Sequence, residues 1–192
     1  MIFLSLDIET SGLTPGLYSV VSIGAVPVVR RRGAWSVNLK RTFYAEIQPQ
    51  PGLLTSEDSV EIHGLDDRYL RDNGASPVEA MTALRTYLET LKSRYGRVRP
   101  AAWPSSFDSP FISWMSEKYL GENILGHSTI DIPSFAMGAL GCTDRRRLHH
   151  VMKEAGYQKP ENLHKHNALS DAIEQAETLC WLLNFSGNEA SP

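Results

Sequence analysis

Residues 2–13 read IFLSLDIETSGL, an apolar run that passes into two acids and a polar turn. The run Ile2–Asp7 predicts a buried strand. Because side chains alternate across a strand, Asp7 and Glu9 point to the same face. A buried carboxylate must be paired or must bind a metal, so two acids on one face indicate a site. A strand end that faces solvent, where both acids cost little, is the alternative.

Turn signals divide the rest of the chain into strands first and helices afterwards. β-Rich stretches at Tyr18–Val29 and Trp35–Ile47 follow the first strand, which predicts an antiparallel meander of three strands. Two short strands are expected later, at Val98–Trp103 and Ser128–Ile132. Helices are expected from a capping box at Thr55–Asp58 up to Gly64, at Pro77–Lys92, from Ser109 with Pro110 in its first turn, from Pro133, around Leu148–Ala155, and at Ala168–Leu183. This order predicts an α/β fold with helices flanking a mixed five-stranded sheet, three antiparallel strands first.

Size and composition fit a single domain, expected over residues 1–185 of the 192, with a disordered tail over residues 186–192. Hydrophobic residues make up 42% and charged residues 21%, as in soluble globular proteins. The start MIFLSLDIE lacks the basic region of a signal peptide, and the longest weakly polar stretch is too short to span a bilayer. A soluble, cytoplasmic protein without a membrane partner is expected, in which Cys142 and Cys180 are reduced thiols.

The formal net charge of −3 provides no global attraction for nucleic acid, although acidic metal ligands would themselves lower the net charge. Basic residues cluster at residues 30–32, 92–99 and 145–147. Solvated surface charge is the ordinary interpretation of such clusters, so they do not by themselves indicate a nucleic-acid site.

Two further acids stand where they could join the first pair. Asp108 lies in SSFDSPF, directly before the helix expected from Ser109, although the helix dipole alone would favour an acid there. Asp171 falls at the edge of the apolar stripe of the last helix, so it is expected to face a cleft between helix and sheet. Asp131 is interpreted as a polar strand end, with an outer-shell acid as the alternative.

Several histidines could act as the base beside these acids. His166 lies in the loop before the last helix, and a pKa near neutrality suits an imidazole to that role. His164, His149 and His150 are competing candidates. Four carboxylates and one histidine are what two Mg²⁺-type ions and a general base require.

The strings DIETSGL, FDSPF and HNALSDA resemble, in order, the three exonuclease motifs of the DEDDh family, the ribonuclease H-like 3′→5′ exonucleases. That family includes proofreading subunits of replicative polymerases, oligoribonuclease and ribonuclease T. The motifs span residues 7–171, nearly the whole chain. The spacing HxAxxD separates this branch from a sister in which tyrosine stands four residues before the last Asp, a position that is Asn167 here.

The resemblance implies a ribonuclease H-like fold and hydrolysis with two divalent cations, Mg²⁺ or Mn²⁺. Asp7, Glu9, Asp108 and Asp171 would hold the cations, and His166 would deprotonate the attacking water. The product would be a nucleoside 5′-monophosphate.

The resemblance also implies contacts to the substrate. The backbone from Thr10 to Gly12 would approach the terminal 3′-OH, and Leu13 would wedge against the last base; an exposed apolar residue in a turn is the alternative for Leu13. His63, in an EIHG segment similar to one in the family, would border the substrate groove, unless it is a helix-terminal histidine before a capping glycine. Trp103 departs from the family, which often has His-Asn near this position, and would offer a platform for a base or fill the core.

The expected activity is metal-dependent release of nucleotides from the 3′ ends of single strands, with RNA favoured over DNA. A proofreading-type DNA exonuclease or polymerase accessory subunit is the first alternative, and a noncatalytic nucleic-acid-binding module is the second. Four converging acids argue against the module, because a protein without metals has no use for them. A homodimer is an alternative to a monomer, since homodimers are common among the relatives.

Overall fold

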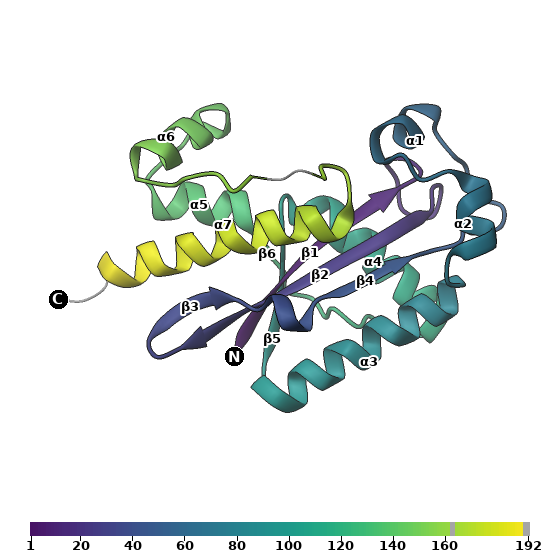
Figure 1. The fold of residues 1–192 in the computed structure, drawn as a ribbon, viewed down its shortest axis with the longest axis horizontal. Helices are drawn as coiled ribbons and strands as arrows, with labels where there is room; N and C mark the ends of the chain where they lie inside the picture. The colour runs from purple at the N-terminus through teal and green to yellow at the C-terminus, as the bar shows by residue number, and fades with distance from the viewer. Residues whose placement is uncertain (162–163, 190–192) are drawn as a thin grey trace.

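The computed structural model describes residues 1–161 and 164–189, and its centre is a six-stranded mixed sheet (Figure 1). Its strand order is β3-β2-β1-β5-β6, and β4 also pairs with β2. The strands are β1 (Ile2–Thr10), β2 (Val20–Arg31), β3 (Ala34–Val37), β4 (Phe43–Glu46), β5 (Val98–Ala102) and β6 (Ile130–Asp131). Strand β2 runs antiparallel to β1, β3 and β4, whereas β5 runs parallel to β1 and β6. The predicted α/β fold with its antiparallel strands first is confirmed.

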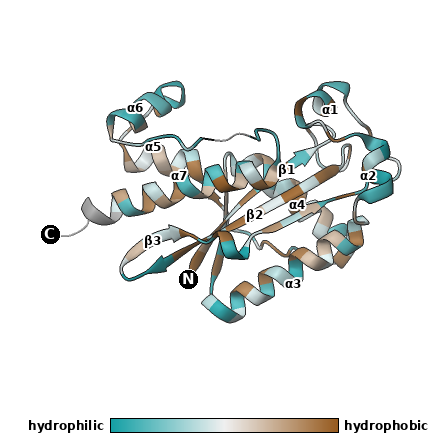
Figure 2. Cartoon of the chain, in the orientation of Figure 1, coloured by the Kyte–Doolittle hydropathy of each residue, from teal (hydrophilic) through white to brown (hydrophobic). Residues whose placement is uncertain are grey.

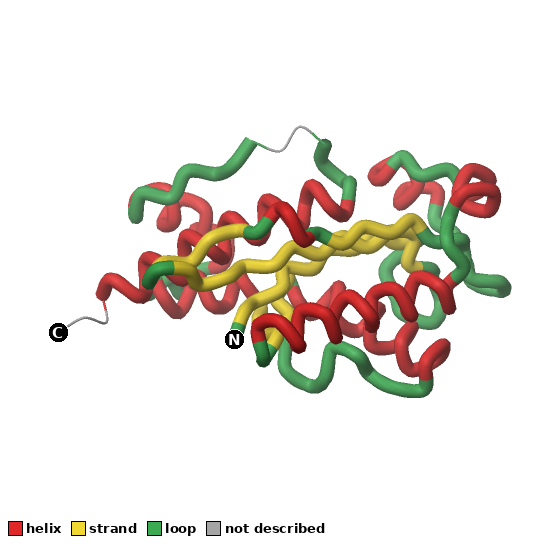
Figure 3. Tube along the Cα trace, turned by 60° about the horizontal axis from the view of Figure 1, so that its bottom comes forward, coloured by secondary structure: helices red, strands yellow, loops and turns green. Residues whose placement is uncertain are grey.

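Helices cover both faces of this sheet, as the tube view shows from a second direction (Figure 3). The helices are α1 (Glu57–His63), α2 (Asp67–Asn73), α3 (Pro77–Tyr95), α4 (Ser105–Leu120), α5 (Ile132–Ala139), α6 (Leu148–Glu154) and α7 (Ala168–Glu189), with short 3₁₀ turns η1 (Leu39–Arg41) and η2 (Arg145–Arg147). Helices α3 and α4 pack on one face, and α7 packs on the other with α5 and α6 beside it. None of the helices within the described residues is both long and apolar enough to cross a bilayer.

Strand β1 divides the core between these two faces. Its even-numbered residues, from Ile2 to Ile8, join the cluster under α3 and α4. Phe3 points the other way, into the cluster under α7. The hydropathy colouring shows apolar strands at the centre and polar residues on the outer helices (Figure 2). By the same alternation Asp7 and Glu9 lie on the α7 face, at the end of the strand.

The prediction of one continuous third strand over Trp35–Ile47 is wrong. The structure divides this segment into β3 and β4, which is why the sheet has a sixth strand. Residues 34–37 pair with β2 beyond Pro27, and residues 43–46 pair with β2 before it. Proline has no N–H to donate to a ladder, so pairing along this edge breaks beside Pro27. The chain leaves the sheet through η1 and returns as β4, after the Asn38 N–H donates to the Pro27 carbonyl at 2.9 Å.

The prediction that a helix begins at Ser109 is also wrong, because α4 begins at Ser105. The Asp131 carboxylate accepts a hydrogen bond from the Ser105 N–H at 2.9 Å, which satisfies a free donor of the first turn. Pro110 therefore lies inside the helix, and Asp108 lies in its first turn rather than before it.

Three smaller expectations about helices also change. Helix α1 starts after Ser56, whose side chain makes no capping hydrogen bond, so the predicted capping box is absent. Helix α2 was not predicted, and the Asp66 carboxylate caps it. Helix α7 continues to Glu189, so residues 186–189 of the expected tail are helical, and residues 190–192 lie outside the described chain.

Candidate active site

Asp7 and Glu9 stand at the end of β1 nearest α7. Asp7 pairs with Gly24 of β2 across the antiparallel ladder, and Glu9 pairs with Ser22. Both acids are partly buried, because one edge of β1 carries β2 and the opposite edge approaches α4. The strand therefore holds the two carboxylates on a rigid element.

Asp108 is brought to this pair by the first turn of α4. Strand β5 pairs with β1 only as far as Ser5, so the Ile8 N–H beyond it needs another acceptor. Asp108 Oδ1 accepts that hydrogen bond at 3.1 Å, and the residue is only 3% exposed. The carboxylate is thus fixed beside the strand between Asp7 and Glu9.

Asp171 comes from the first turns of α7, which lies directly against β2 at Gly24. A Cβ atom at Gly24 would stand 2.1 Å from the Ala168 carbonyl oxygen, so only glycine permits this approach. Because Gly24 pairs with Asp7, the start of α7 and the acid of β1 lie side by side. One turn beyond Asp171, Gln175 Nε2 donates to Asp7 Oδ1 at 2.6 Å.

The acids repel one another in this enclosed space. Burial raises the pKa of Asp7 well above its usual range, and the charges of Asp108, Glu9 and Asp171 raise it further, against a lowering by the Gln175 hydrogen bond. Burial, with Asp171 and Asp108 nearby, raises the pKa of Glu9 to about 7. Burial also raises the pKa of Asp108 to about 7, although backbone hydrogen bonds oppose it. A bound cation would reverse each of these shifts.

His166 lies beside the acids, on the loop that leads into α7. One ligand atom each from Glu9, His166 and Asp171 fall within 4.8 Å of one another. The His166 N–H donates to Asp171 Oδ2 at 2.8 Å, and the backbone has a φ of 62°. A non-glycine residue in this left-handed region is uncommon and occurs often at functional sites. The imidazole itself is exposed.

The competing histidines are not part of the group formed by Glu9, His166 and Asp171. His149 stacks on Trp103, and His150 Nε2 pairs with Glu154 at 3.2 Å. His164 lines a pocket with His63 and His166, next to residues 162–163, which the structure does not describe. Of these candidates, the described geometry brings His166 to the acids.

The predicted substrate residues divide between two sides of the acid cluster. On one side the Thr10 hydroxyl donates to the Gly12 carbonyl at 2.7 Å, and Leu13 is 80% exposed. A Cβ atom on Gly12 would overlap the Tyr18 ring, so the turn requires glycine. His63 lines the pocket that contains His166.

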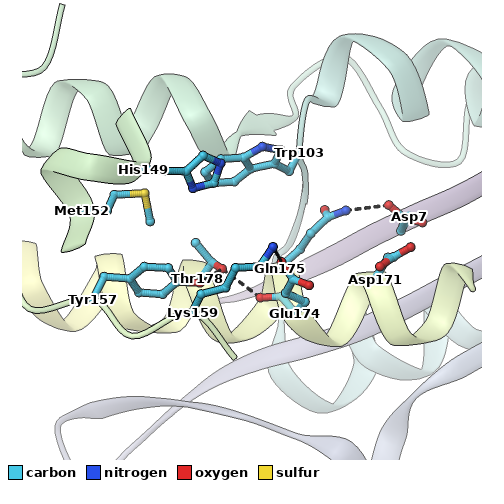
Figure 4. A pocket seen from close by; sticks show the side chains of 10 residues that line it. All are labelled: Asp7, Trp103, His149, Met152, Tyr157, Lys159, Asp171, Glu174, Gln175 and Thr178. Carbon is cyan, nitrogen blue, oxygen red and sulfur yellow. Dashed lines mark hydrogen bonds and ion pairs between the residues drawn. The ribbon is translucent and has the colours of Figure 1, made fainter. Parts of the chain in front are cut away.

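Trp103 lies on the other side, in a cavity bordered by Asp7 and Asp171 (Figure 4). Asp131 is the last residue of β6, as its interpretation as a polar strand end predicted. Asp131 caps α5 through the Ser134 N–H and anchors the first turn of α4, which carries Asp108. Gln175 is not among the predicted site residues, although its position four residues after Asp171 puts it on the same side of the helix.

Carboxylate oxygens beside an imidazole are donors that suit hard divalent cations such as Mg²⁺ and Mn²⁺. The residues fit such ions, because buried carboxylates that raise one another's pKa need positive charge to be stable as anions. Asp7, Glu9, Asp108 and Asp171 are the residues that would hold them.

A family model described as Exonuclease, of the RNase T type, matches residues 4–179. The chain belongs to this exonuclease family. The DNA exonuclease Cap18 of Escherichia coli, described as a 3′-5′ enzyme, is 33% identical over 180 residues, which are 92% of this chain and 88% of that protein. The predicted membership of the DEDDh 3′→5′ exonucleases is confirmed, and the protein is a phosphodiester hydrolase.

Two solved structures share the fold of this exonuclease. The nuclease domain of 3′hExo, described as a DEDDh family member bound to rAMP, matches with a TM-score of 0.72 and 13% identity, over 95% of this chain and 91% of that one. Exonuclease I of E. coli, in complex with a dT13 oligonucleotide, matches with a TM-score of 0.69 and 16% identity. That alignment covers 94% of this chain and 40% of the other.

Proposed function

We propose that the exonuclease removes nucleotides one at a time from the 3′ ends of single-stranded nucleic acid, in a reaction that requires two divalent cations. The observation that carries the proposal is the convergence of Asp7, Glu9, Asp108 and Asp171 at the end of β1, with His166 beside Glu9 and Asp171. Burial raises the pKa of Asp7, Glu9 and Asp108, and the charges of Asp108 and Asp171 raise the pKa of Asp7 and Glu9 further. Such an arrangement is costly to fold unless cations neutralise it.

The residues then have distinct roles. The four carboxylates would hold the cations, which when bound would stabilise charge on the scissile phosphate and the leaving 3′ oxygen. His166 accepts a proton from the attacking water, and its exposed imidazole can exchange that proton with solvent. Gln175 holds the Asp7 carboxylate through its 2.6 Å hydrogen bond. Water adds to phosphorus and the 3′ oxygen leaves, which releases a nucleoside 5′-monophosphate.

The terminal nucleotide is proposed to lie on the side of Leu13 and His63. The backbone from Thr10 to Gly12 approaches the 3′-OH, and the exposed Leu13 side chain wedges against the last base. The His63 Nδ1 accepts from the Leu65 N–H at 3.0 Å, so its proton is on Nε2. That Nε2 is buried without a hydrogen-bond partner among the described residues, which supports a donor role toward the terminal nucleotide.

DNA is the first substrate to test, although the sequence analysis favours RNA. The relative that is 33% identical over most of both chains is described as a DNA exonuclease. The rAMP bound to 3′hExo belongs to a protein of 13% identity, which supports a shared fold only.

The experiment compares matched 5′-labelled DNA and RNA strands, single-stranded and with a recessed 3′ end, in Mg²⁺ or Mn²⁺. A ladder that shortens from the 3′ end and is absent with chelator is the expected result. Faster cleavage of the RNA strand than of the DNA strand would instead support the expectation from the sequence that RNA is the preferred substrate. No cleavage of any strand would reject the proposal and favour a noncatalytic binding module.

A further inference from the structure

Two of the three basic clusters in the sequence meet at the end of the sheet that lies away from the acids. Residues 30–41 contain five lysines and arginines and residues 92–99 contain four, of 19 in the whole chain, and neither segment contains an acid. The Ile2 N–H donates to the Arg97 carbonyl at 2.9 Å, so the second segment lies at the start of β1, whereas the acids lie near its other end. Figure 1 shows the end of α3 beside this start of β1. The proposed function uses none of these basic residues.

The side chain of Tyr95, at the end of α3, gathers three arginines from separate segments. The Arg94 guanidinium lies 5.6 Å from the centre of the Tyr95 ring, and Asn38 Nδ2 donates to the Tyr95 hydroxyl at 3.3 Å. Burial acts to raise the pKa of Tyr95, but hydrogen bonds from Arg94 and Arg31 and the charge of Arg41 lower it below its usual value. Arg31 and Arg94 are exposed and Arg41 is half-buried, so the three guanidinium groups share one surface.

This arginine cluster has no acid to neutralise it. None of its three arginines forms an ion pair among the residues that the structure describes, whereas Arg71 and Arg85 pair with Asp67 and Glu122 at 3.6 and 3.3 Å. Three guanidinium groups around one hydroxyl repel one another, as the carboxylates of the active site do with the opposite sign. A bound anion would relieve that repulsion.

A shallow hollow of about 440 Å³ lies beside the cluster, along the outer side of α3. Guanidinium groups and hydroxyls are the side chains that bind phosphate oxygens in nucleic-acid complexes. The hollow offers both kinds, with one acid among its described lining residues: Arg41, Arg94, Thr86, Thr90, Ser93 and Glu89.

The length of β1 relates this cluster to the active site. The strand has nine residues, and at a rise of about 3.3 Å per residue its ends lie roughly 26 Å apart. Nucleotides of a stacked strand rise about 3.4 Å each, so roughly eight nucleotides span that distance. The polyanion that the enzyme must hold in any case is its substrate. We propose that the cluster of Arg31, Arg41 and Arg94 around Tyr95 binds the phosphate backbone of the substrate strand, roughly eight nucleotides before the 3′ end.

This inference rests on the proposed function, because it assumes that the 3′ end lies at the acids. Contacts to phosphate fix a strand without reading its sequence, and they weaken with salt because bound counterions are released. The cluster should therefore favour long strands over short ones, whatever their sequence, and most strongly at low salt.

The test compares a strand of about 20 nucleotides with one of about four, which is too short to reach from the acids to the cluster. The variant is Arg31→Ala with Arg94→Ala, and its control is Arg71→Ala with Arg85→Ala, which removes the same charge outside the cluster. We expect the cluster variant to raise KM about 10-fold on the long strand, with kcat nearly unchanged, and less than about 2-fold on the short one. The control should change either KM by less than about 2-fold.

Two further readouts separate charge from folding. The slope of log KM against log salt on the long strand should fall by about 1.4 in the cluster variant, the value for two lost phosphate contacts on a single strand. Arg31→Lys with Arg94→Lys keeps the charge and should restore most of the affinity. An equal rise of KM on both strands, or the same effect in the control, would overturn the cluster as a nucleic-acid contact. Failure of wild type to cleave either strand would instead reject the proposed function.

Discussion

The two acids that the core holds most firmly, Asp7 and Asp108, differ from His166, the histidine on the loop before α7. Asp7 belongs to the central strand, and Asp108 accepts a hydrogen bond from that strand while it is 3% exposed. His166 is exposed, sits on a loop with a φ of 62°, and follows closely on residues outside the described chain. The proposed cation site therefore lies in the core of the fold, whereas the proposed base lies on its surface. Loss of an acid and loss of the histidine should have different consequences.

The largest effect is expected for Asp7→Ala. The variant removes a proposed cation ligand, so cleavage should fall by at least about 10³-fold. It also removes a buried carboxylate that the neighbouring acids repel, so the metal-free variant should melt at the same temperature as the metal-free wild type or at a higher one. Turnover and thermal melting check both expectations. A melting temperature far below that of wild type would recast Asp7 as a structural residue.

His166→Ala should reduce the rate by about 10²–10⁴-fold and leave cation binding almost intact, because the variant removes a base and no carboxylate. Single-turnover rates and a Mn²⁺ titration separate these two properties. Full activity in this variant would move the base assignment to His164 or another group.

Gly24→Ala tests whether the close approach of α7 to β2 positions Asp171. Overlap of the new methyl group with the Ala168 carbonyl should cost about 1–3 kcal/mol of unfolding free energy and lower the rate. Gly138→Ala in α5 is the control, because a Cβ atom there meets nothing within 4 Å and should stabilise the helix by up to about 1 kcal/mol. Denaturant unfolding measures both. Similar stability and activity of the two variants would show that the approach at Gly24 is not needed.

The last prediction concerns pH. The pKa of Glu9 is raised from 4.5 to about 7, and that of Asp108 from 3.8 to about 7. Between about pH 4 and pH 7 the metal-free folded state therefore binds more protons than the unfolded chain. Stability from these groups is therefore full below about pH 4 and is lost as the pH rises through about 7. Melting in chelator should show this decline, and Asp108→Asn should reduce its slope. A melting temperature that rises over this range in chelator would contradict the raised pKa values.

The sequence predicted the parts of this site that depend on local pattern. Alternation along β1 placed Asp7 and Glu9 on one face, and the apolar stripe of α7 placed Asp171 at a cleft. Contacts between distant segments could not be predicted from such local patterns. The start of α4 depends on Asp131, which is 26 residues away from Ser105, and the split of the third strand depends on its pairing beside Pro27. Gln175 could be placed on its helix, but its bond to Asp7 spans 168 residues.

The most direct test of the account is the number of Mn²⁺ ions that the wild-type exonuclease binds, measured by calorimetry beside His166→Ala and Asp7→Ala. The account predicts two ions per chain for wild type and for His166→Ala, and weaker or incomplete binding for Asp7→Ala. Absence of Mn²⁺ binding to wild type, or binding to Asp7→Ala that matches wild type, would contradict the claim that the buried acids form a cation site.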